Sequence, residues 1–266
     1  VTGLLQLLVE SRGLLHAVHF KVFLREDIFL AVEGLQNKSH LEAFMQKVEF
    51  KPEDLWRLAL NLVAREGTGG SLAYRELLAR KGIRAPWEVD EARLRESLEP
   101  LWGQTLESGN AVRTANYIIK RTSDGAERLF PRTFVQLLNV AFQEARKMEP
   151  QPDRILPRRA LQAGVESASL QRAEDLKKEY VELVPYLEAM EGMSERVNFE
   201  KLKSHLGPGV KKRSEANLHL GARGWKNVAR RLVEVGVLAE TGGKDEVTYT
   251  VALMYRKGLK VTARGY

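Results

Sequence analysis

Three consecutive charged residues, Arg25, Glu26 and Asp27, follow an apolar-rich run at residues 18–24. The run is short and rich in β-forming residues, which is typical of a strand that is buried on both faces of a parallel sheet. Ligands of open α/β sheets bind beyond the carboxyl ends of the strands, where an arginine can stabilise phosphate charge. Arg25 and Asp27 are therefore candidate nucleotide-sensing residues. The alternative is that these charges are only a solvated strand end.

A second candidate for phosphate binding is Arg132, which follows Pro131 at the first turn of a predicted helix. The helix dipole disfavours a cation at this end of a helix, so a negatively charged partner such as a phosphate would explain its presence. The alternative is a surface arginine without a ligand.

A third group of residues is basic and lies near the C-terminus. Residues 198–231 hold nine basic side chains and two acidic ones, whereas the whole chain has a net charge of +7. Such a window indicates a polyanion partner. The alternative is a solvated lysine-rich face, which is what a run of charged residues usually forms. The candidate DNA-binding residues in and near the window are Lys211, Lys212, Arg213, Arg223, Lys226, Asn227, Arg230 and Lys244.

Several kinds of chemistry are absent from the sequence. There is no cysteine, and the five histidines show no metal-ligand spacing, so we predict neither a metal site nor a cysteine nucleophile. The chain contains no Gly-x-x-x-x-Gly-Lys-Ser/Thr phosphate loop and no Gly-x-Ser-x-Gly elbow, and we assign no catalytic residue. No run of eighteen apolar residues occurs, so we expect no membrane partner and a cytoplasmic location.

The elements that must position these residues are mostly helices. Apolar periodicity and start and stop signals predict helices at 39–48, 52–66, 72–79 with Ser71 as N-cap, 88–101, 114–120, 131–148, from 157 onward, and 169–190 with a kink or break at Pro185. The tryptophans at 56, 87, 102 and 225 are interpreted as packing residues. The predicted fold class is therefore mainly α.

The C-terminal part has a specific order of elements. A short extended piece at 197–199 is followed by a helix at 200–206, a Gly-Pro-Gly loop, and a helix at 224–235. Two β-rich segments, 237–241 and 247–251, then flank a glycine-containing turn, which predicts a hairpin. Three helices followed by a hairpin are the order of a winged helix. In that fold one helix enters the DNA major groove and the loops contact phosphates.

Residues 129–145, LFPRTFVQLLNVAFQEA, resemble the sensor-2 helix of AAA-type and STAND-type P-loop ATPases, particularly the branch related to origin-recognition ATPases. In that family a Pro-Arg pair opens a helix of the lid domain and the arginine reaches the nucleotide phosphates, so the resemblance implies this role for Arg132. Residues 21–29 similarly resemble a late core strand of bacterial members. Residues 225–238 and 247–259 resemble the winged helix that follows the lid.

From this resemblance we expect three domains: the end of a P-loop nucleotide-binding core at 1–36, an all-helical lid at 37–168, and a winged helix at 169–266. The Walker A lysine and Walker B acidic residues are missing from the chain, so we expect an intact protein that binds ATP and Mg²⁺ through a core preceding these residues. The winged helix would bind double-stranded DNA, in replication-like remodelling or in defence against foreign DNA. The missing core, other subunits and further copies of the chain remain open as partners.

An alternative function is a non-enzymatic one. The chain would then be a winged-helix adaptor or transcriptional regulator with a helical protein-interaction domain. Affinity for DNA and its dependence on salt distinguish these hypotheses.

Overall fold

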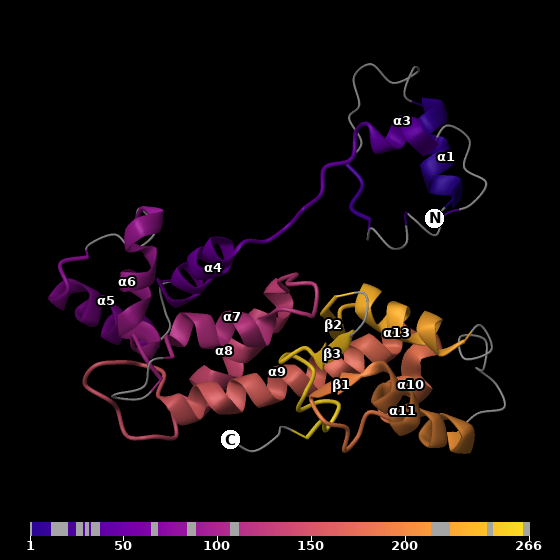
Figure 1. The fold of residues 1–266 in the computed structure, drawn as a ribbon. Helices are drawn as coiled ribbons and strands as arrows, with labels where there is room; N and C mark the ends of the chain where they lie inside the picture. The colour runs from indigo at the N-terminus through magenta and orange to yellow at the C-terminus, as the bar shows by residue number, and fades with distance from the viewer. Residues whose placement is uncertain are drawn as a thin grey trace. The chain divides into compact units, whose positions relative to one another are not determined.

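The computed structural model describes residues 2–11, 21–24, 29, 32, 38–64, 69–83, 89–106, 112–213, 224–243 and 247–262 (Figure 1). The chain divides into two compact units, Val1–Val48 and Glu49–Tyr266, which we describe separately. Helices predominate, and the strands of the described residues form a small three-stranded antiparallel sheet in the second unit. The predicted mainly α fold class is therefore confirmed.

The first unit contains α1 (Thr2–Ser11) and α3 (Lys38–Glu42). Among the residues of this unit that the structure describes, Leu5, Phe29 and Val32 are buried in one small cluster. The helix predicted at 39–48 ends at Glu42, and residues 45–48 have no regular structure. Few apolar contacts are available there to hold a longer helix.

The strand expected at 21–29 is wrong for the residues that the structure describes. Residues 21–24 have no regular structure, and Phe23 is 86% exposed. A strand is stabilised by hydrogen bonds to a neighbouring strand, and no strand occurs among the described residues of this unit. The described residues of this unit therefore do not show the expected remnant of an α/β core. Arg25, Glu26 and Asp27 lie outside the described residues.

The second unit begins with helices whose positions the sequence largely predicts: α4 (Pro52–Ala64), α5 (Gly69–Arg80), α6 (Glu91–Trp102), α7 (Thr114–Thr122) and α8 (Pro131–Ala145). The carboxylate of Asp90 caps α6 by accepting a hydrogen bond from the backbone N–H of Arg93. Ser71 is not an N-cap, because α5 already begins at Gly69.

These helices bury one apolar core. Trp56 packs edge-on against Trp102 and Phe134, with ring centroids 5.6 and 6.2 Å apart. Both tryptophans are buried, which confirms them as packing residues, whereas residue 87 lies outside the described residues. Aromatic pairs of this geometry stabilise a core beyond the area that they bury.

A single helix, α9 (Arg158–Glu179), replaces the two helices predicted from 157 and from 169. It is followed by a short 3-10 helix, η2 (Val181–Leu183), and a short α-helix, α10 (Val184–Glu188). Ala168 belongs to the core of the preceding helices and Ala173 to a separate C-terminal core. Since α9 runs through residue 168 and contributes to both cores, it joins them mechanically. The three-domain division itself stays a prediction.

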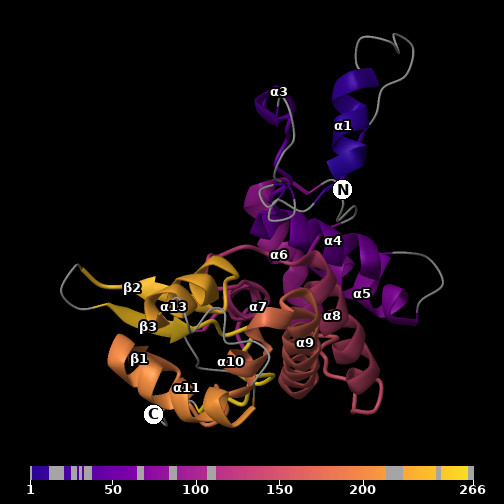
Figure 2. The same cartoon turned by 90° about the vertical axis from the view of Figure 1, so that its right-hand side faces the viewer.

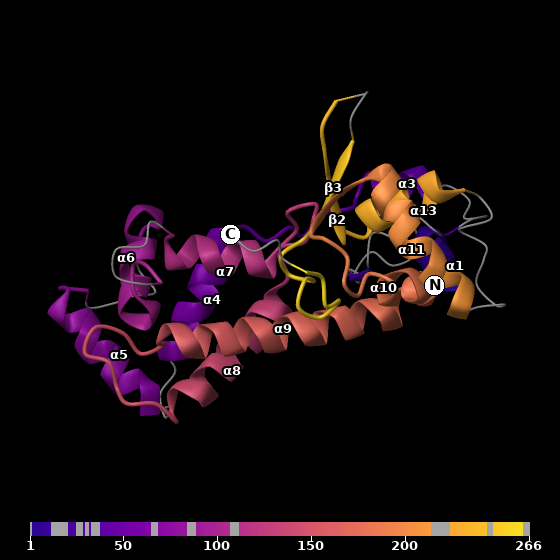
Figure 3. The same ribbon diagram turned by 60° about the horizontal axis from the view of Figure 1, so that its bottom comes forward.

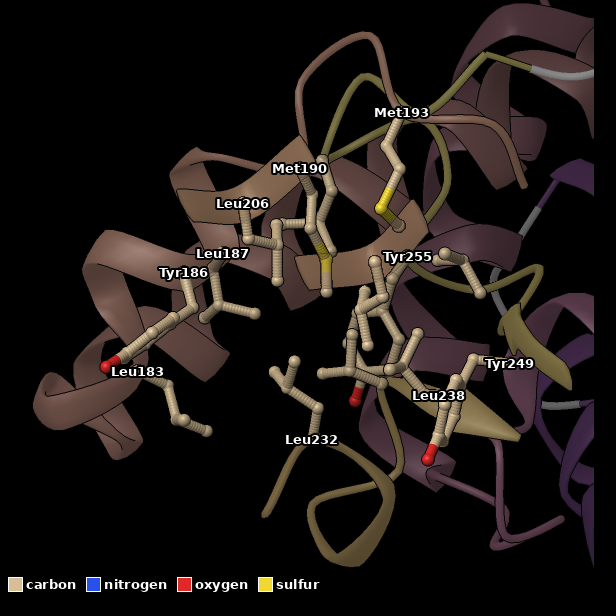
Figure 4. Close-up of a cluster of buried hydrophobic side chains, with 14 of the residues drawn as sticks. Leu183, Tyr186, Leu187, Met190, Met193, Leu206, Leu232, Leu238, Tyr249 and Tyr255 are labelled. Atoms are coloured by element: carbon tan, nitrogen blue, oxygen red, sulfur yellow. The ribbon is translucent and has the colours of Figure 1, made fainter. Parts of the chain in front are cut away.

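The C-terminal part contains β1 (Arg196–Asn198), α11 (Phe199–Arg213), α13 (Trp225–Glu234), β2 (Leu238–Thr241) and β3 (Thr248–Val251). The sheet order is β1-β3-β2, with Val197 opposite Tyr249 and Leu238 opposite Val251. The predicted hairpin is confirmed. Figure 4 shows apolar side chains of α10, α13 and the strands that converge around Leu232 to form this core.

The Gly-Pro-Gly loop predicted after residue 206 is wrong, because α11 continues through it. Leu206 and Val210 lie one helical turn apart and are both buried, so their packing holds the helix together. Gly209 allows a close approach, since a Cβ there would lie 2.8 Å from the Cβ of Ala189. Tertiary packing therefore overrides the local preference of Gly-Pro-Gly for a loop.

Candidate nucleic-acid interface

Helix α13 has one buried face and one solvent-exposed basic face. Val228, Ala229 and Leu232 are buried in the C-terminal core, and Lys226 and Arg230 are exposed. The spacing of three and four residues places the apolar positions on one side of the helix and leaves the two cations on the other.

The start of α13 is fixed by its neighbours. Gly224 precedes the helix with a φ of 93°, which favours glycine. Trp225 packs edge-on against Tyr186 of α10, with ring centroids 6.0 Å apart and an interplanar angle of 86°. The prediction that Trp225 is a packing residue is therefore confirmed, and its ring holds the first turn of α13 against α10.

The exposed face presents an ordered pair of polar side chains. Nη2 of Arg230 donates a hydrogen bond of 2.6 Å to Oδ1 of Asn227, and Nε of Arg230 lies 3.8 Å from Oε1 of Glu234. The Arg230 side chain is 70% exposed. Because an exposed ion pair contributes little to stability, Arg230 can exchange Glu234 for a phosphate or a base at small cost.

Arg231 has a structural position on the same helix. Its guanidinium lies 3.3 Å from carboxylate oxygens of both Glu182 and Glu234, and its Cζ lies 5.3 Å from the centroid of the Tyr180 ring. These contacts tie α13 to the segment before α10. Arg231 is thus held away from the Lys226–Arg230 face.

The other predicted DNA-binding residues are less well defined. Lys211, Lys212 and Arg213 form the last three residues of α11, where the structure describes the backbone but not the side chains. Arg223 and Lys244 lie outside the described residues. Of the predicted set, the structure therefore brings Lys226, Asn227 and Arg230 together on one helix face.

Arg132 lies in the first turn of α8, directly after Pro131, as predicted. Its side chain is exposed, and among the described residues it has no ion-pair partner. The N-cap residue Phe130 makes no side-chain hydrogen bond to the first turn of α8. The first turn thus combines backbone N–H groups that this residue does not cap with an exposed cation, which suits an anion.

The sequence did not reveal a tight contact between the loop after α7 and the end of α13. The carboxylate of Asp124 is fully buried and accepts hydrogen bonds from the backbone N–H groups of Ala126 and Arg128, both at 2.9 Å. It also pairs with Nε of Arg128 at 2.7 Å, while Nη2 of Arg128 donates to the carbonyl oxygen of Glu234 at 3.1 Å. The charged loop thereby caps the C-terminus of α13.

A second pair of contacts closes this junction. The backbone N–H of Gly125 donates a 2.6 Å hydrogen bond to the carbonyl oxygen of Gly236. Gly236 has a φ of 79°, and a Cβ at this position would overlap Oδ2 of Asp124. Both glycines are thus required for the close approach. The Asp-Gly pair at 124–125 and the glycine after α13 predict turns, but nothing local indicates that the turns meet.

A buried arginine of α9, Arg172, contacts the aromatic ring just before α8. The Arg172 guanidinium lies 3.2 Å from Oε1 of Glu179 and 4.5 Å from the centroid of the Phe130 ring. Burial raises the pKa of the nearby Tyr255 to about 12, an effect that the positive charge of Arg172 opposes. Tyr255 therefore stays neutral in the folded protein well above the pH at which a free tyrosine ionises.

This shift predicts a loss of stability at alkaline pH. An unfolded tyrosine ionises near pH 10, whereas folded Tyr255 resists ionisation until about 12, so the stability it contributes is complete below pH 10 and falls as the pH rises toward 12. Between about pH 9 and about pH 11 the wild type should lose ~1.4 kcal/mol more than Tyr255→Phe. Urea unfolding of both proteins at the two pH values measures the difference, and equal losses would contradict the burial of the hydroxyl.

Other features of the described residues do not form a site. A cleft of about 370 Å³ lies beside the ends of α5 and α6, and four of the five charged residues that line it pair with one another: Lys81 with Glu99, and Arg154 with Asp153. No group of three metal-ligating side chains occurs in the described part of the chain. Among its helices, none has both the length and the apolar character needed to span a bilayer.

No protein-family model matches the chain, and neither curated proteins nor solved structures give a match. A functional assignment therefore has to come from the residues of the chain and their geometry.

Proposed function

We propose that the segment from α10 to β3 is a winged helix that binds double-stranded DNA through α13, within the C-terminal regulatory portion of a P-loop ATPase. The observation that supports it most is the order of elements, α10, β1, α11, α13, β2 and β3, together with the sheet order β1-β3-β2. In this arrangement α13 takes the place of the recognition helix and the β2–β3 hairpin that of the wing.

The exposed side chains of α13 suit the two kinds of contact that DNA offers. Lys226 would bind a phosphate oxygen as a point charge. Arg230 and Asn227 have the donor and acceptor groups with which arginine reads guanine and asparagine reads adenine in the major groove. Their mutual hydrogen bond orders both side chains before binding, which lowers the entropy lost on complex formation.

The ATPase part of the proposal comes from the resemblance of residues 129–145 to a sensor-2 helix. Arg132, exposed at an uncapped helix start, suits a phosphate. The sequence contains no phosphate loop, so ATP and Mg²⁺ would be held mainly by a core that these residues do not include. The state of the nucleotide would then set the position of the helices that carry the winged helix, in remodelling or in defence against foreign DNA.

A titration of fluorescent duplex DNA tests the proposal. The double variant Lys226→Ala/Arg230→Ala should bind about 30-fold more weakly than the wild type, from the loss of ~2 kcal/mol of contacts. It should also reduce the slope of log affinity against log salt by about 1 to 2. The matched control is Arg159→Ala/Lys178→Ala, which removes two exposed cations from α9.

The outcomes separate the two candidate functions. Equal effects of the α13 variant and the α9 control, or an affinity that does not change with salt, would contradict DNA binding and leave the adaptor function. In the complete protein, ATP with Mg²⁺ should shift the DNA affinity, and Arg132→Ala should remove this shift. A nucleotide response that survives Arg132→Ala would exclude this arginine from the nucleotide site.

A further inference from the structure

Helix α7 carries a second basic face that lies outside the C-terminal window. Together with its N-cap Arg113, it contains Lys120 and Arg121 and no acidic residue. Arg113 and Lys120 are exposed, while Ile118 and Thr122 are buried against the core. Arg113 and Lys120 therefore lie on the outward side of the helix, with Arg121 half-buried, and no carboxylate on the same helix neutralises them.

Arg121 has an unusual environment. Its Cζ lies 3.7 Å from the centroid of the Tyr117 ring, and its Nη1 donates a 3.4 Å hydrogen bond to the carbonyl oxygen of Tyr117. No carboxylate lies within ion-pair distance of Arg121 among the described residues. Burial lowers the pKa of Arg121; Tyr117 opposes this shift, and the positive charge of Arg256 adds to it.

The neighbouring arginine has its own partner. Arg256 pairs with Glu195 and donates from Nε to the carbonyl oxygen of Val251 at 2.9 Å. Arg121 is thus a half-buried guanidinium that is stacked and oriented by an aromatic ring, and it has no carboxylate within ion-pair distance among the described residues. An anion bound there would pair with its charge and use the preorganised planar donor group.

The position of α7 relative to α13 is the basis for assigning a class of anion to Arg121. Figure 3 shows α7, the β2–β3 hairpin and α13 on the same side of α9, with the hairpin between the two helices, and Figure 2 shows the same three elements on one side of α9. The contact of Asp124 and Gly125 with Gly236 joins the end of α7 to the end of α13. The two basic faces therefore have a fixed relation to each other.

We propose that α7 is a second nucleic-acid contact, in which Arg113, Lys120 and Arg121 bind phosphodiester oxygens of the same duplex that α13 reads. This rests on the proposed DNA binding by α13. The contacts carry no base specificity. They extend the surface with which the protein contacts the duplex beyond the winged helix and across the hairpin. They also increase the dependence of binding on salt.

The test is a charge-matched comparison. Arg113→Gln/Lys120→Gln/Arg121→Gln should weaken binding to a duplex of about 30 base pairs by ~10-fold or more, and should reduce the salt slope by about 2 to 3. Arg95→Gln/Arg159→Gln/Lys178→Gln removes the same charge from exposed sites elsewhere and should change affinity by less than about 3-fold. Because Arg121 is partly buried, the exposed double variant Arg113→Gln/Lys120→Gln is measured as well, and it should keep most of the effect.

The results distinguish this inference from the function on which it rests. If the α13 variant weakens binding while the α7 variants behave like the charge-matched control, α7 makes no contact and DNA binding by α13 still stands. If the wild type does not bind DNA, both proposals are overturned. If the α7 variants lose binding to all duplexes and also to an acidic peptide of equal charge, the face recognises negative charge in general and the assignment to a phosphodiester backbone is wrong.

Discussion

Replacing Asp124 with alanine should lower the free energy of unfolding of the second unit by about 3 kcal/mol. The carboxylate is fully buried and holds two backbone N–H groups and Nε of Arg128. Its removal takes the acceptor from two part-buried backbone N–H groups and the ion-pair partner from Arg128, and it leaves the space of a buried side chain empty. Urea unfolding followed by tryptophan fluorescence measures the loss. Glu96→Ala, which removes an exposed carboxylate, is the control and should change stability by less than ~0.5 kcal/mol.

The partner of Asp124 across the junction allows a stricter test. Gly236→Ala introduces a Cβ that overlaps Oδ2 of Asp124, and it also forces a side chain into a backbone with φ of 79°. In the Asp124→Ala background the overlap with the carboxylate is gone, and the backbone cost of about 1 kcal/mol remains together with the 2.7 Å approach to Nη2 of Arg128, a side-chain end that can move. The two substitutions should therefore be less than additive. Full additivity would mean that the loop and the end of α13 do not meet.

The contact between the Asp124 loop and the end of α13 connects the helical part of the second unit to its C-terminal part. Helix α9 passes through both cores, Arg172 of α9 contacts the ring of Phe130 before α8, and the loop after α7 caps α13. These contacts connect the helices α4–α8 to α13 within the second unit. If the proposed function holds, such a connection would let a shift of the helices reach α13, whereas a free hinge would not.

The features that were predictable from the sequence depend on local patterns. The alternation in the segment at 247–251 and the glycine-containing turn before it define the hairpin, and the spacing of Val228, Leu232 and the two cations defines the faces of α13. The start of α8 at Pro131 follows from the preference of proline for the first turn. These signals act within a few residues, so distant parts of the chain do not alter them.

The errors occur where distant contacts decide the structure. An apolar-rich run at 18–24 becomes a strand only beside another strand, and Phe23 is exposed. The Gly-Pro-Gly segment stays helical because Leu206 and Val210 are buried. The junction of Asp124 and Gly236 joins residues more than a hundred positions apart, and no local rule connects them. The α7 face was missed because three cations in a short helix resemble any solvated surface.

A second large loss of stability is expected from substitutions at the interface between α8 and α9. Ala160, Gly164 and Ala168 are buried at intervals of four residues on one side of α9. A Cβ at Gly164 would overlap the carbonyl oxygen of Leu137 and lie 3.3 Å from the Cβ of Ala141. The two backbones therefore touch at this point, which only glycine allows. Gly164→Leu should destabilise the second unit by about 3 kcal/mol or more, because the helices must separate to admit the side chain.

A graded series makes this prediction strict. Gly164→Ala gains about 1 kcal/mol of helix propensity but adds an overlap that costs roughly 1–3 kcal/mol, so it should fall between the wild type and Gly164→Leu. Glu166→Leu, an exposed substitution on the same helix, should leave stability within ~0.5 kcal/mol of the wild type. Because α9 belongs to both cores, hydrogen exchange in Gly164→Leu should accelerate in α13 as well as in α8. Faster exchange confined to α8 would show that the C-terminal core is stable without the α8–α9 contact, and that the two parts are not rigidly coupled.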